Sequence, residues 1–327
     1  MAAIEQYWYR RSPLHLLLYP LSLLFHALVW LRRTAYRIGL LRVTHLGVPV
    51  VVIGNISVGG TGKTPLTLAL AQHLIELGWH PLIVSRGHGA AAETPRAVTP
   101  ESQAQTVGDE PLLMAQRKLC PVWIGANRVA AAQSALNAHP ECDVILCDDG
   151  LQHYRLARDF EIAVIDGNRR FGNGWLMPAG PLREPLSRLH NVDAIVCNGC
   201  KAAAGELAMT LHGDVFRNLR DPENIQPAAA FSGLRCHAAA GIGDPTRFFR
   251  HLAALGLRCT THPFPDHHVF QPAELDFAEC DALLLTEKDA VKCSAFADEK
   301  YWALRVDARI DPALIDDLMR KISPHGR

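Results

Sequence analysis

Short apolar runs alternate with longer amphipathic segments over the first two thirds of this chain. The apolar runs, each followed by a polar or glycine-rich turn, cover residues 50–53, 80–85, 121–125, 143–147, 161–166 and 192–198. Segments with helical spacing of apolar residues separate them, most clearly at 66–78. Strands that alternate with helices predict a parallel sheet with helices on both faces. We therefore expect an α/β fold whose functional groups lie at the carboxyl ends of the strands.

The pattern is irregular at residues 90–105, which we expect to form a loop, and again at 199–226, which we expect to link two lobes. A second α/β unit follows, with strand-like runs at 236–240, 258–264 and 282–286 and an amphipathic helix at 246–256. We therefore predict three parts: a membrane-associated helix over 1–36, a larger domain with a phosphate-binding loop over 37–226, and a C-terminal α/β domain over 227–327.

The N-terminal segment 13–31 contains no Asp, Glu, Lys or Arg. Arginine pairs flank it at 10–11 and 32–33, and aromatic residues lie near its ends at Trp8, Tyr9, Trp30 and Tyr36. It is just long enough to cross a bilayer, but its apolar character is interrupted by His15, Pro20, Ser22 and His26. These interruptions favour a helix that lies in the membrane interface over a clean span. A buried core helix is the alternative, and the flanking arginines argue against it.

Lys and Arg total 33, as do Asp and Glu, so the formal net charge is zero. This balance argues against a nucleic-acid partner, because nucleic-acid-binding proteins usually carry a basic excess. Among the nine cysteines, Cys197 and Cys200 form a CxxC, but a zinc site would need a second close pair. We expect ordinary reduced thiols in a reducing compartment, with a redox pair as the alternative.

The segment 54–65, Gly-Asn-Ile-Ser-Val-Gly-Gly-Thr-Gly-Lys-Thr-Pro, has the layout of a P-loop between a strand and a helix. Its glycines let backbone N–H groups surround phosphate oxygens, Lys63 can reach the β- and γ-phosphates, and the Thr64 hydroxyl can bind Mg²⁺. A structural strand–turn–helix joint is the alternative. The predicted phosphate-binding residues are Ser57, Val58, Gly59, Gly60, Thr61, Gly62, Lys63 and Thr64.

Acidic residues at the ends of predicted elements are the candidate metal ligands. Asp148 and Asp149 follow the apolar run 143–147, the place where P-loop folds carry an acid that holds Mg²⁺. Asp149 could instead stabilise the turn that follows. Asp109 and Glu110 stand where a loop meets a helix, so they either cap that helix or act as general base and metal ligand.

Basic residues and histidines complete the candidate site. Arg128 follows a strand end and Arg183 lies in a proline-rich loop; both are candidate phosphate contacts. The alternatives are a solvated arginine for Arg128 and an ion pair with Glu184 for Arg183. Histidine is the side chain suited to proton transfer near neutral pH, so either His267 or His268 could share or relay a proton, with a structural role as the alternative.

Taken in order, these motifs resemble the tetraacyldisaccharide 4′-kinase family of Gram-negative bacteria. The matching segments cover most of the chain and lie at 54–65, 85–89, 107–111, 125–128, 148–153, 172–174, 178–185, 264–267 and 286–290. The resemblance implies two α/β lobes with ATP bound between them. It also implies transfer of the γ-phosphate to the 4′-hydroxyl of a tetraacyldisaccharide 1-phosphate, which gives lipid IVA.

The same resemblance assigns roles within the site. It makes Asp109 the base, assisted by His267, and gives Asp148 and Asp149 to Mg²⁺ and the phosphates. An acylated disaccharide stays in the bilayer, so we expect the enzyme at the cytoplasmic face of the bacterial inner membrane. The alternative function is a membrane-tethered P-loop ATPase without a phosphorylated lipid product. The sequence predicts no particular protein partner.

Overall fold

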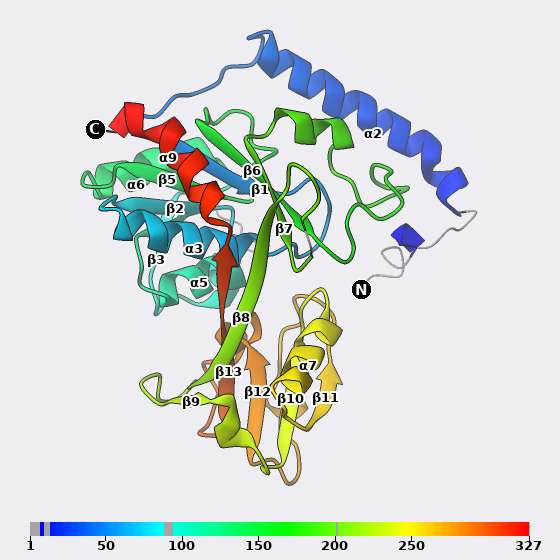
Figure 1. Ribbon diagram of the computed structural model, residues 1–327, viewed down its shortest axis with the longest axis vertical. Coiled ribbons are helices and arrows are strands. Elements are labelled where there is room, and N and C mark those ends of the chain that lie inside the picture. The colour runs from blue at the N-terminus through cyan, green and yellow to red at the C-terminus, as the bar shows by residue number, and fades with distance from the viewer. Residues whose placement is uncertain (1–6, 10–13, 88–93, 201, 327) are drawn as a thin grey trace.

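The computed structural model describes residues 7–9, 14–87, 94–200 and 202–326. The arginine pair at 10–11 and His88 of the segment 85–89 lie outside this range. A 13-stranded sheet runs through both lobes in the order β11-β10-β12-β13-β8-β7-β6-β1-β5-β2-β4-β3, with β9 paired to β8 (Figure 1). The sheet is parallel except where β3 meets β4, β9 meets β8, and β8 meets β13.

The upper lobe in Figure 1 contains the strands that sequence periodicity predicted. They are β1 (Val50–Gly54), β2 (Pro81–Ser85), β4 (Val122–Ile124), β5 (Val144–Asp148), β6 (Phe160–Asp166) and β7 (Ala194–Asn198). The segment 90–105 is not a loop throughout, because it contains β3 (Arg96–Val98) and the start of α4 (Ala104–Val107). Strand β3 is short and largely exposed at the sheet edge, so it leaves little hydrophobic pattern.

Helices cover both faces of this lobe, as the α/β prediction requires. Alternate residues of β1 enter two different cores: Val51 and Ile53 join one, Val50 and Val52 the other. The first core is completed by α3 (Lys63–Glu76), α5 (Asp109–Gln116) and α9 (Pro312–Gly326), and the second by α6 (Arg128–Ala138). The predicted doubly covered sheet is therefore confirmed.

The lower lobe has its own cores around a smaller part of the sheet. Its elements are β10 (Cys236–Ala240), α7 (Pro245–Ala254), β11 (Cys259–Pro263), β12 (Ala282–Thr286), α8 (Glu287–Cys293), β9 (Ile225–Pro227) and the 3₁₀ turns η2 (Ala228–Phe231) and η3 (Pro272–Glu274). Asp244 caps α7 by accepting a hydrogen bond from the Arg247 N–H.

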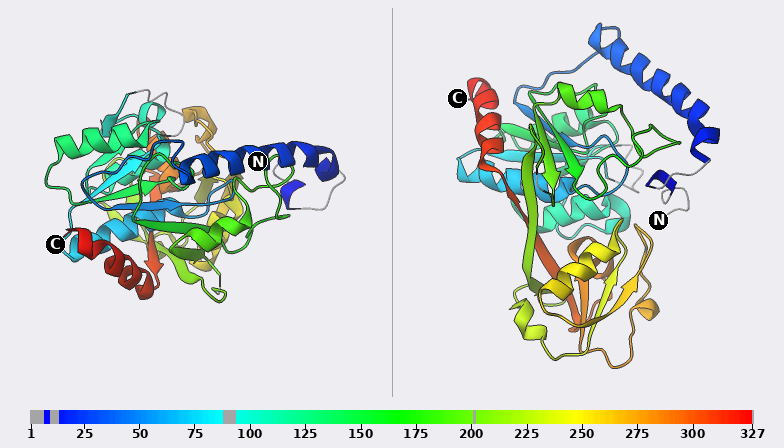
Figure 2. Two further views of the ribbon diagram at one scale, coloured as in Figure 1. Left: turned by 90° about the horizontal axis from the view of Figure 1, so that it is seen from above. Right: turned by 45° about the vertical axis from the view of Figure 1, so that its right-hand side comes forward.

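Two long antiparallel strands, β8 (Leu207–Asn218) and β13 (Tyr301–Ile310), join the lobes (Figure 2). The segment 199–226 is therefore not an irregular link. Strand β8 escaped prediction because β13, its partner along most of its length, lies far away in sequence, and because its alternation in burial, regular from Met209 to Val215, changes phase at Phe216. After β13 the chain returns to the upper lobe as α9, whose Leu314, Leu318 and Ile322 are buried there.

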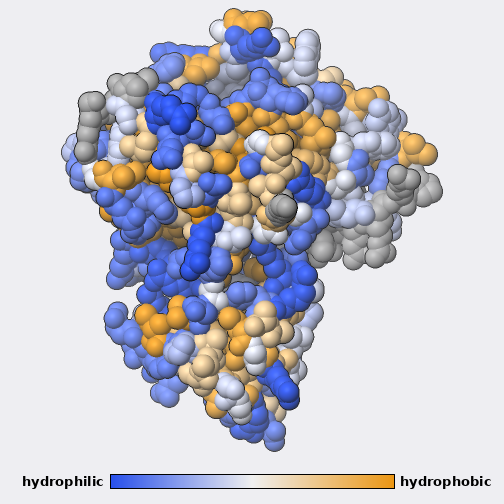
Figure 3. All heavy atoms as spheres, viewed as in Figure 1, coloured by the Kyte–Doolittle hydropathy of each residue, from blue (hydrophilic) through white to orange (hydrophobic). Residues whose placement is uncertain are grey.

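Helix α2 (Leu14–Arg37) lies along the outside of the upper lobe. His15 and Ser22 face the protein, and the Ser22 hydroxyl donates to the Leu176 carbonyl and accepts from the Ala179 N–H. The opposite face exposes a stripe of leucines at 17, 21, 24, 28 and 31. In Figure 3, hydrophobic residues accordingly appear over the upper lobe around this helix. Two of the polar interruptions are thus protein contacts.

Candidate functional site

The P-loop connects buried β1 to the first turn of α3. Gly59 and Gly62 have positive φ angles of 105° and 97°, which side chains other than glycine rarely adopt. A Cβ on Gly62 would also lie 2.4 Å from the Asn198 amide nitrogen. The proline-rich segment 178–185 holds the loop in place, because the Val58 N–H donates to the Pro181 carbonyl. The predicted phosphate cradle is therefore a turn that requires glycine at positions 59 and 62.

Lys63 at the start of α3 is directed at the end of β5. Its ammonium lies 3.5 Å from Asp149, and Arg183 donates to the same carboxylate at 3.4 Å. Burial alone would raise the pKa of Asp149, but the charges of Lys63 and Arg183 outweigh it and hold that pKa below its usual range. Arg183 therefore pairs with Asp149 rather than with Glu184, which contacts Tyr154, Gln152 and Arg188 instead.

Asp148 is fully buried and has few partners for a charged group. Its carboxylate accepts from Thr67 at 3.3 Å and from Ser85 at 3.4 Å. Burial and the nearby Glu110 carboxylate raise its pKa to about 7. The predicted acids Glu110, Asp148 and Asp149 do not form a compact carboxylate cluster among the residues that the structure describes.

Asp109 and His267 come from different lobes and meet. Asp109 is the first residue of α5, and its Oδ2 lies 3.5 Å from His267 Nδ1. His268 instead contacts Glu274 at 2.9 Å. Of the two adjacent histidines, His267 is therefore the one beside the predicted base. Its backbone has a φ of 59°, so a tight turn places its ring.

Arg128 is buried at the N-terminus of α6, where Asn127 caps the helix. Its guanidinium donates to the carbonyls of Gly125 and Ala126, at 3.1 and 3.3 Å. Burial lowers its pKa, and the charges of Asp149 and Asp148 partly oppose that effect. The side chain is therefore fixed behind the two aspartates rather than solvated.

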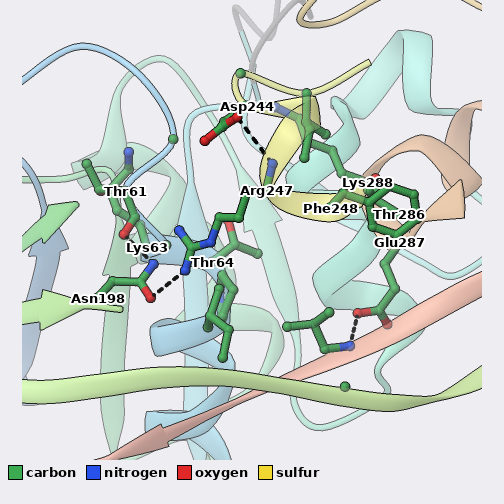
Figure 4. A pocket seen from close by; sticks show the side chains of 18 of the residues that line it. Thr61, Lys63, Thr64, Asn198, Asp244, Arg247, Phe248, Thr286, Glu287 and Lys288 are labelled. Carbon is green, nitrogen blue, oxygen red and sulfur yellow. Dashed lines mark hydrogen bonds between the residues drawn. The ribbon is translucent and has the colours of Figure 1, made fainter. Parts of the chain in front are cut away.

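A cavity of about 530 Å³ lies between the lobes. One wall is the P-loop from Gly60 to Thr64, and Figure 4 shows Lys63 and Thr64 on that side with Lys288 and Phe248 across from them. Asn198 joins both walls, because it donates to the Thr61 carbonyl and accepts from Arg247.

Comparison with known proteins identifies the relatives of this chain. A family model described as tetraacyldisaccharide-1-P 4′-kinase matches residues 14–323. The chain belongs to this family. Tetraacyldisaccharide 4′-kinases from Azoarcus sp. and Methylobacillus flagellatus are 50% and 48% identical to it, over 100% and 98% of this chain and 97% and 96% of theirs. These matches confirm the predicted family, enzyme class and lipid A biosynthetic role.

A solved structure is also similar to this member of the 4′-kinase family. It is described as the "apo" form LpxK from Aquifex aeolicus in complex with ATP. The two share 29% sequence identity with a TM-score of 0.80, over 94% of this chain and 99% of that one. The fold and the assignment as an ATP-binding kinase are thus confirmed.

Sequence reasoning missed the contacts that the second lobe makes in this 4′-kinase. Asn198, Arg247 and Lys288 line the interlobe cavity, and none of them was assigned a role from the sequence. Lys288 lies in the segment 286–290 that carries the family resemblance, and the strand ends at Asn198 and Thr286 were a further signal, because parallel sheets place functional groups there.

The cysteine prediction needs correction at one pair. Cys197 and Cys200 form a disulfide, as the alternative of a redox pair allowed, whereas the other seven cysteines are free thiols as expected. Cys197 is near the end of β7, and the tight turn at Gly199 brings the two sulfurs together. These cysteines and Glu206 are close enough to share a metal, but the disulfide occupies both sulfurs and Arg170 binds Glu206.

Proposed function

We propose that this chain transfers the γ-phosphate of ATP to the 4′-hydroxyl of a membrane-bound tetraacyldisaccharide 1-phosphate, giving lipid IVA. The observation that carries the proposal is the meeting of Asp109 with His267 across the lobes. Their chain neighbours Glu110 and Asp266 line the same cavity as the P-loop. A base, a histidine partner and a phosphate cradle thus converge from separate parts of the sequence.

The proposed reaction is an in-line displacement. Asp109 accepts the proton of the 4′-hydroxyl while the sugar oxygen bonds to the γ-phosphorus and the bond to the β–γ bridging oxygen breaks. His267 beside the carboxylate orients it and can take up the proton afterwards. Lys63 stabilises the charge on the transferred group once the phosphates compete for it with Asp149. Arg183 and Arg128 support the same anionic region.

Mg²⁺ fits the oxygen donors beside the P-loop. The buried Asp148 carboxylate has two long hydrogen bonds and a raised pKa, the condition that a divalent cation relieves. Thr64 and Glu110 would join it, and Asp149 would do so after releasing Lys63. Mg²⁺ usually takes one or two protein carboxylates and completes its shell with water and substrate phosphates, so a compact cluster is not required. When bound, it would neutralise phosphate oxygens.

The exposed leucine face of α2 supports membrane association. The helix His15–Arg37 has the length and apolar character for a bilayer, and only 11% of its apolar window is buried. An acylated substrate stays in the membrane, so an enzyme that binds the surface through this face can reach the sugar. Because ATP is a cytoplasmic substrate, we place the enzyme at the cytoplasmic face of the inner membrane.

Mass spectrometry of the acceptor lipid tests this function. Wild-type protein with ATP, Mg²⁺ and tetraacyldisaccharide 1-phosphate should add one phosphate to the lipid, whereas Asp109→Asn should lose about 10²-fold or more in turnover. Asp276→Asn, at an exposed aspartate of the lower lobe, is the matched control and should keep wild-type turnover. Release of free phosphate with an unmodified lipid would instead indicate a membrane-tethered ATPase.

A further inference from the structure

Two lysines of α8 in the lower lobe face two acidic residues of α5 in the upper lobe. Lys288 and Lys292 are four residues apart and therefore lie on one side of the helix. Lys288 Nζ is 3.5 Å from Glu110 Oε1, and Lys292 Nζ is 3.9 Å from Asp109 Oδ2. Each of the two neighbouring carboxylates at the start of α5 thus has its own lysine from the other lobe.

The Lys292 ammonium is almost completely buried and well supplied with partners. It lies 2.7 Å from Asp289 Oδ1 and donates to the carbonyls of His268 at 3.2 Å and Gly241 at 3.4 Å. The two carbonyls accept hydrogen bonds from the ammonium, whereas Asp289 Oδ1 is an ion-pair partner that accepts no hydrogen bond. At 3.9 Å, Asp109 experiences the charge of Lys292 without a direct hydrogen bond.

The same contacts hold the turn that carries His267. The Gly241 carbonyl accepts both from the His267 N–H and from Lys292, and the Gly241 N–H donates to Asp289. Lys292 also binds the carbonyl of the following residue, His268. The left-handed backbone at His267 is therefore fixed from both sides by one buried side chain.

We propose that Lys292 is a positioning residue for phosphoryl transfer. It fixes the turn of His267 and draws Asp109 Oδ2, which faces both Lys292 and His267, towards that ring. Lys288 has the matching role for Glu110. The inference rests on the proposed function of Asp109 and His267. It adds that α8 aligns the base and the metal-binding acid only when the two lobes are together.

A double-mutant cycle tests the role of Lys292. Lys292→Met should lower kcat about tenfold or more, because small displacements of a catalytic pair are costly, and should leave the KM for ATP within about twofold. Lys292→Arg, which keeps the charge, should recover most of the loss. In a His267→Ala background, Lys292→Met should cost less than about threefold, since the group it positions is already absent. The exposed Lys300→Met is the control and should behave as wild type.

Equal losses from Lys292→Met in the two backgrounds, or a kcat within twofold of wild type, would overturn the proposal. If Lys292→Met does not melt cooperatively, Lys288→Met decides instead, because that side chain is 20% exposed and its loss should not prevent folding. Lys288→Met should lower kcat about tenfold in wild type and much less with Glu110→Gln; equal costs would again overturn it. A wild-type protein that leaves the lipid unphosphorylated would refute the proposed function itself.

Discussion

At the level of single residues, two neighbouring aspartates at the end of β5 have opposite electrostatic environments. Asp148 points into the protein, where burial and Glu110 raise its pKa to about 7. Asp149 adopts a positive φ of 49° and turns towards Lys63 and Arg183, which hold its pKa low against the effect of burial. One residue is thus ready to receive a cation, while the other keeps the P-loop lysine in place.

The raised pKa of Asp148 predicts a pH-dependent stability without Mg²⁺. Between about pH 4 and pH 7 the folded state holds a proton that the unfolded state has lost, so stability falls as pH rises through this window. Asp148→Asn removes this loss and should raise the unfolding free energy by about 1–4 kcal/mol above pH 7 and by almost nothing below pH 4. Urea titrations in EDTA across this range measure it. A gain that is the same at all pH values would contradict the prediction.

Lys63→Met should separate folding from phosphate transfer. The substitution removes charge stabilisation of the transferred group, and we expect turnover to fall about 10²–10³-fold. Asp149 keeps Arg183 as a partner, so the melting temperature should change little. Steady-state kinetics and thermal melts on the same preparation check both parts, with the exposed Lys118→Met as control. Retained turnover in Lys63→Met would exclude the P-loop as the phosphate site.

At the level of elements, the contact between α5 and α8 joins the two lobes. Besides the two lysine contacts at the start of α5, Arg117 just after its end binds Glu287 at 2.8 Å, the Val306 carbonyl at 2.8 Å and Asp307 at 2.7 Å. Burial raises the pKa of Glu287 and the charge of Arg117 opposes that effect. The ion pair therefore favours the charged form of the Glu287 carboxylate.

Arg117→Met should destabilise the protein by about 3 kcal/mol, because it leaves the Glu287 carboxylate buried without its cation. Adding Glu287→Gln should recover part of the loss, since the unpaired charge is then removed. Chemical denaturation of both variants measures these changes. Arg320→Met, which breaks an exposed pair with Asp317, is the matched control and should cost less than about 0.5 kcal/mol. An Arg117 variant as stable as this control would show that the contact between α5 and α8 contributes little.

At the level of the whole molecule, a continuous sheet links two lobes that each contribute half of the site. Strands β8 and β13 cross from one lobe to the other, and α9 then packs in the upper lobe. The polypeptide chain therefore passes between the lobes more than once. The division at residues 226 and 227 remains a prediction, and the last helix of the C-terminal part packs in the upper core.

The exposed leucines of α2 predict that the protein binds membranes through this face, so that replacing them should weaken membrane binding without unfolding the protein. Leu24→Asp together with Leu28→Asp should lower partition onto anionic vesicles more than about tenfold, since each buried leucine contributes about 1.5–3 kcal/mol. Both side chains are exposed, so the melting temperature should stay close to that of wild type. Co-sedimentation with vesicles measures the effect, and Leu77→Asp, at an exposed leucine after α3, should bind normally. Unchanged partition of the double variant would exclude this face as the membrane contact.

The sequence alone determined the features that depend on local chemistry. The β-branched run before the glycines of the P-loop, the strand that ends in Asp148, and the helical spacing after Lys63 each specify their own structure within a few residues. The order of the motifs was sufficient to recognise the family. Asp109 and His267 were paired only by that recognition, because no sequence spacing relates two residues on different lobes.

Only the tertiary structure decided which side chains meet. The partners of Asp109 and the pairing of β8 with β13 depend on segments that are distant in sequence, whereas the disulfide of Cys197 depends on the turn at Gly199. The tertiary structure also decided the pKa values of two aspartates. Asp148 and Asp149 are adjacent residues of the same type, but burial raises the pKa of Asp148, whereas Lys63 and Arg183 lower the pKa of Asp149. Long-range packing and burial, which local patterns do not encode, made these choices.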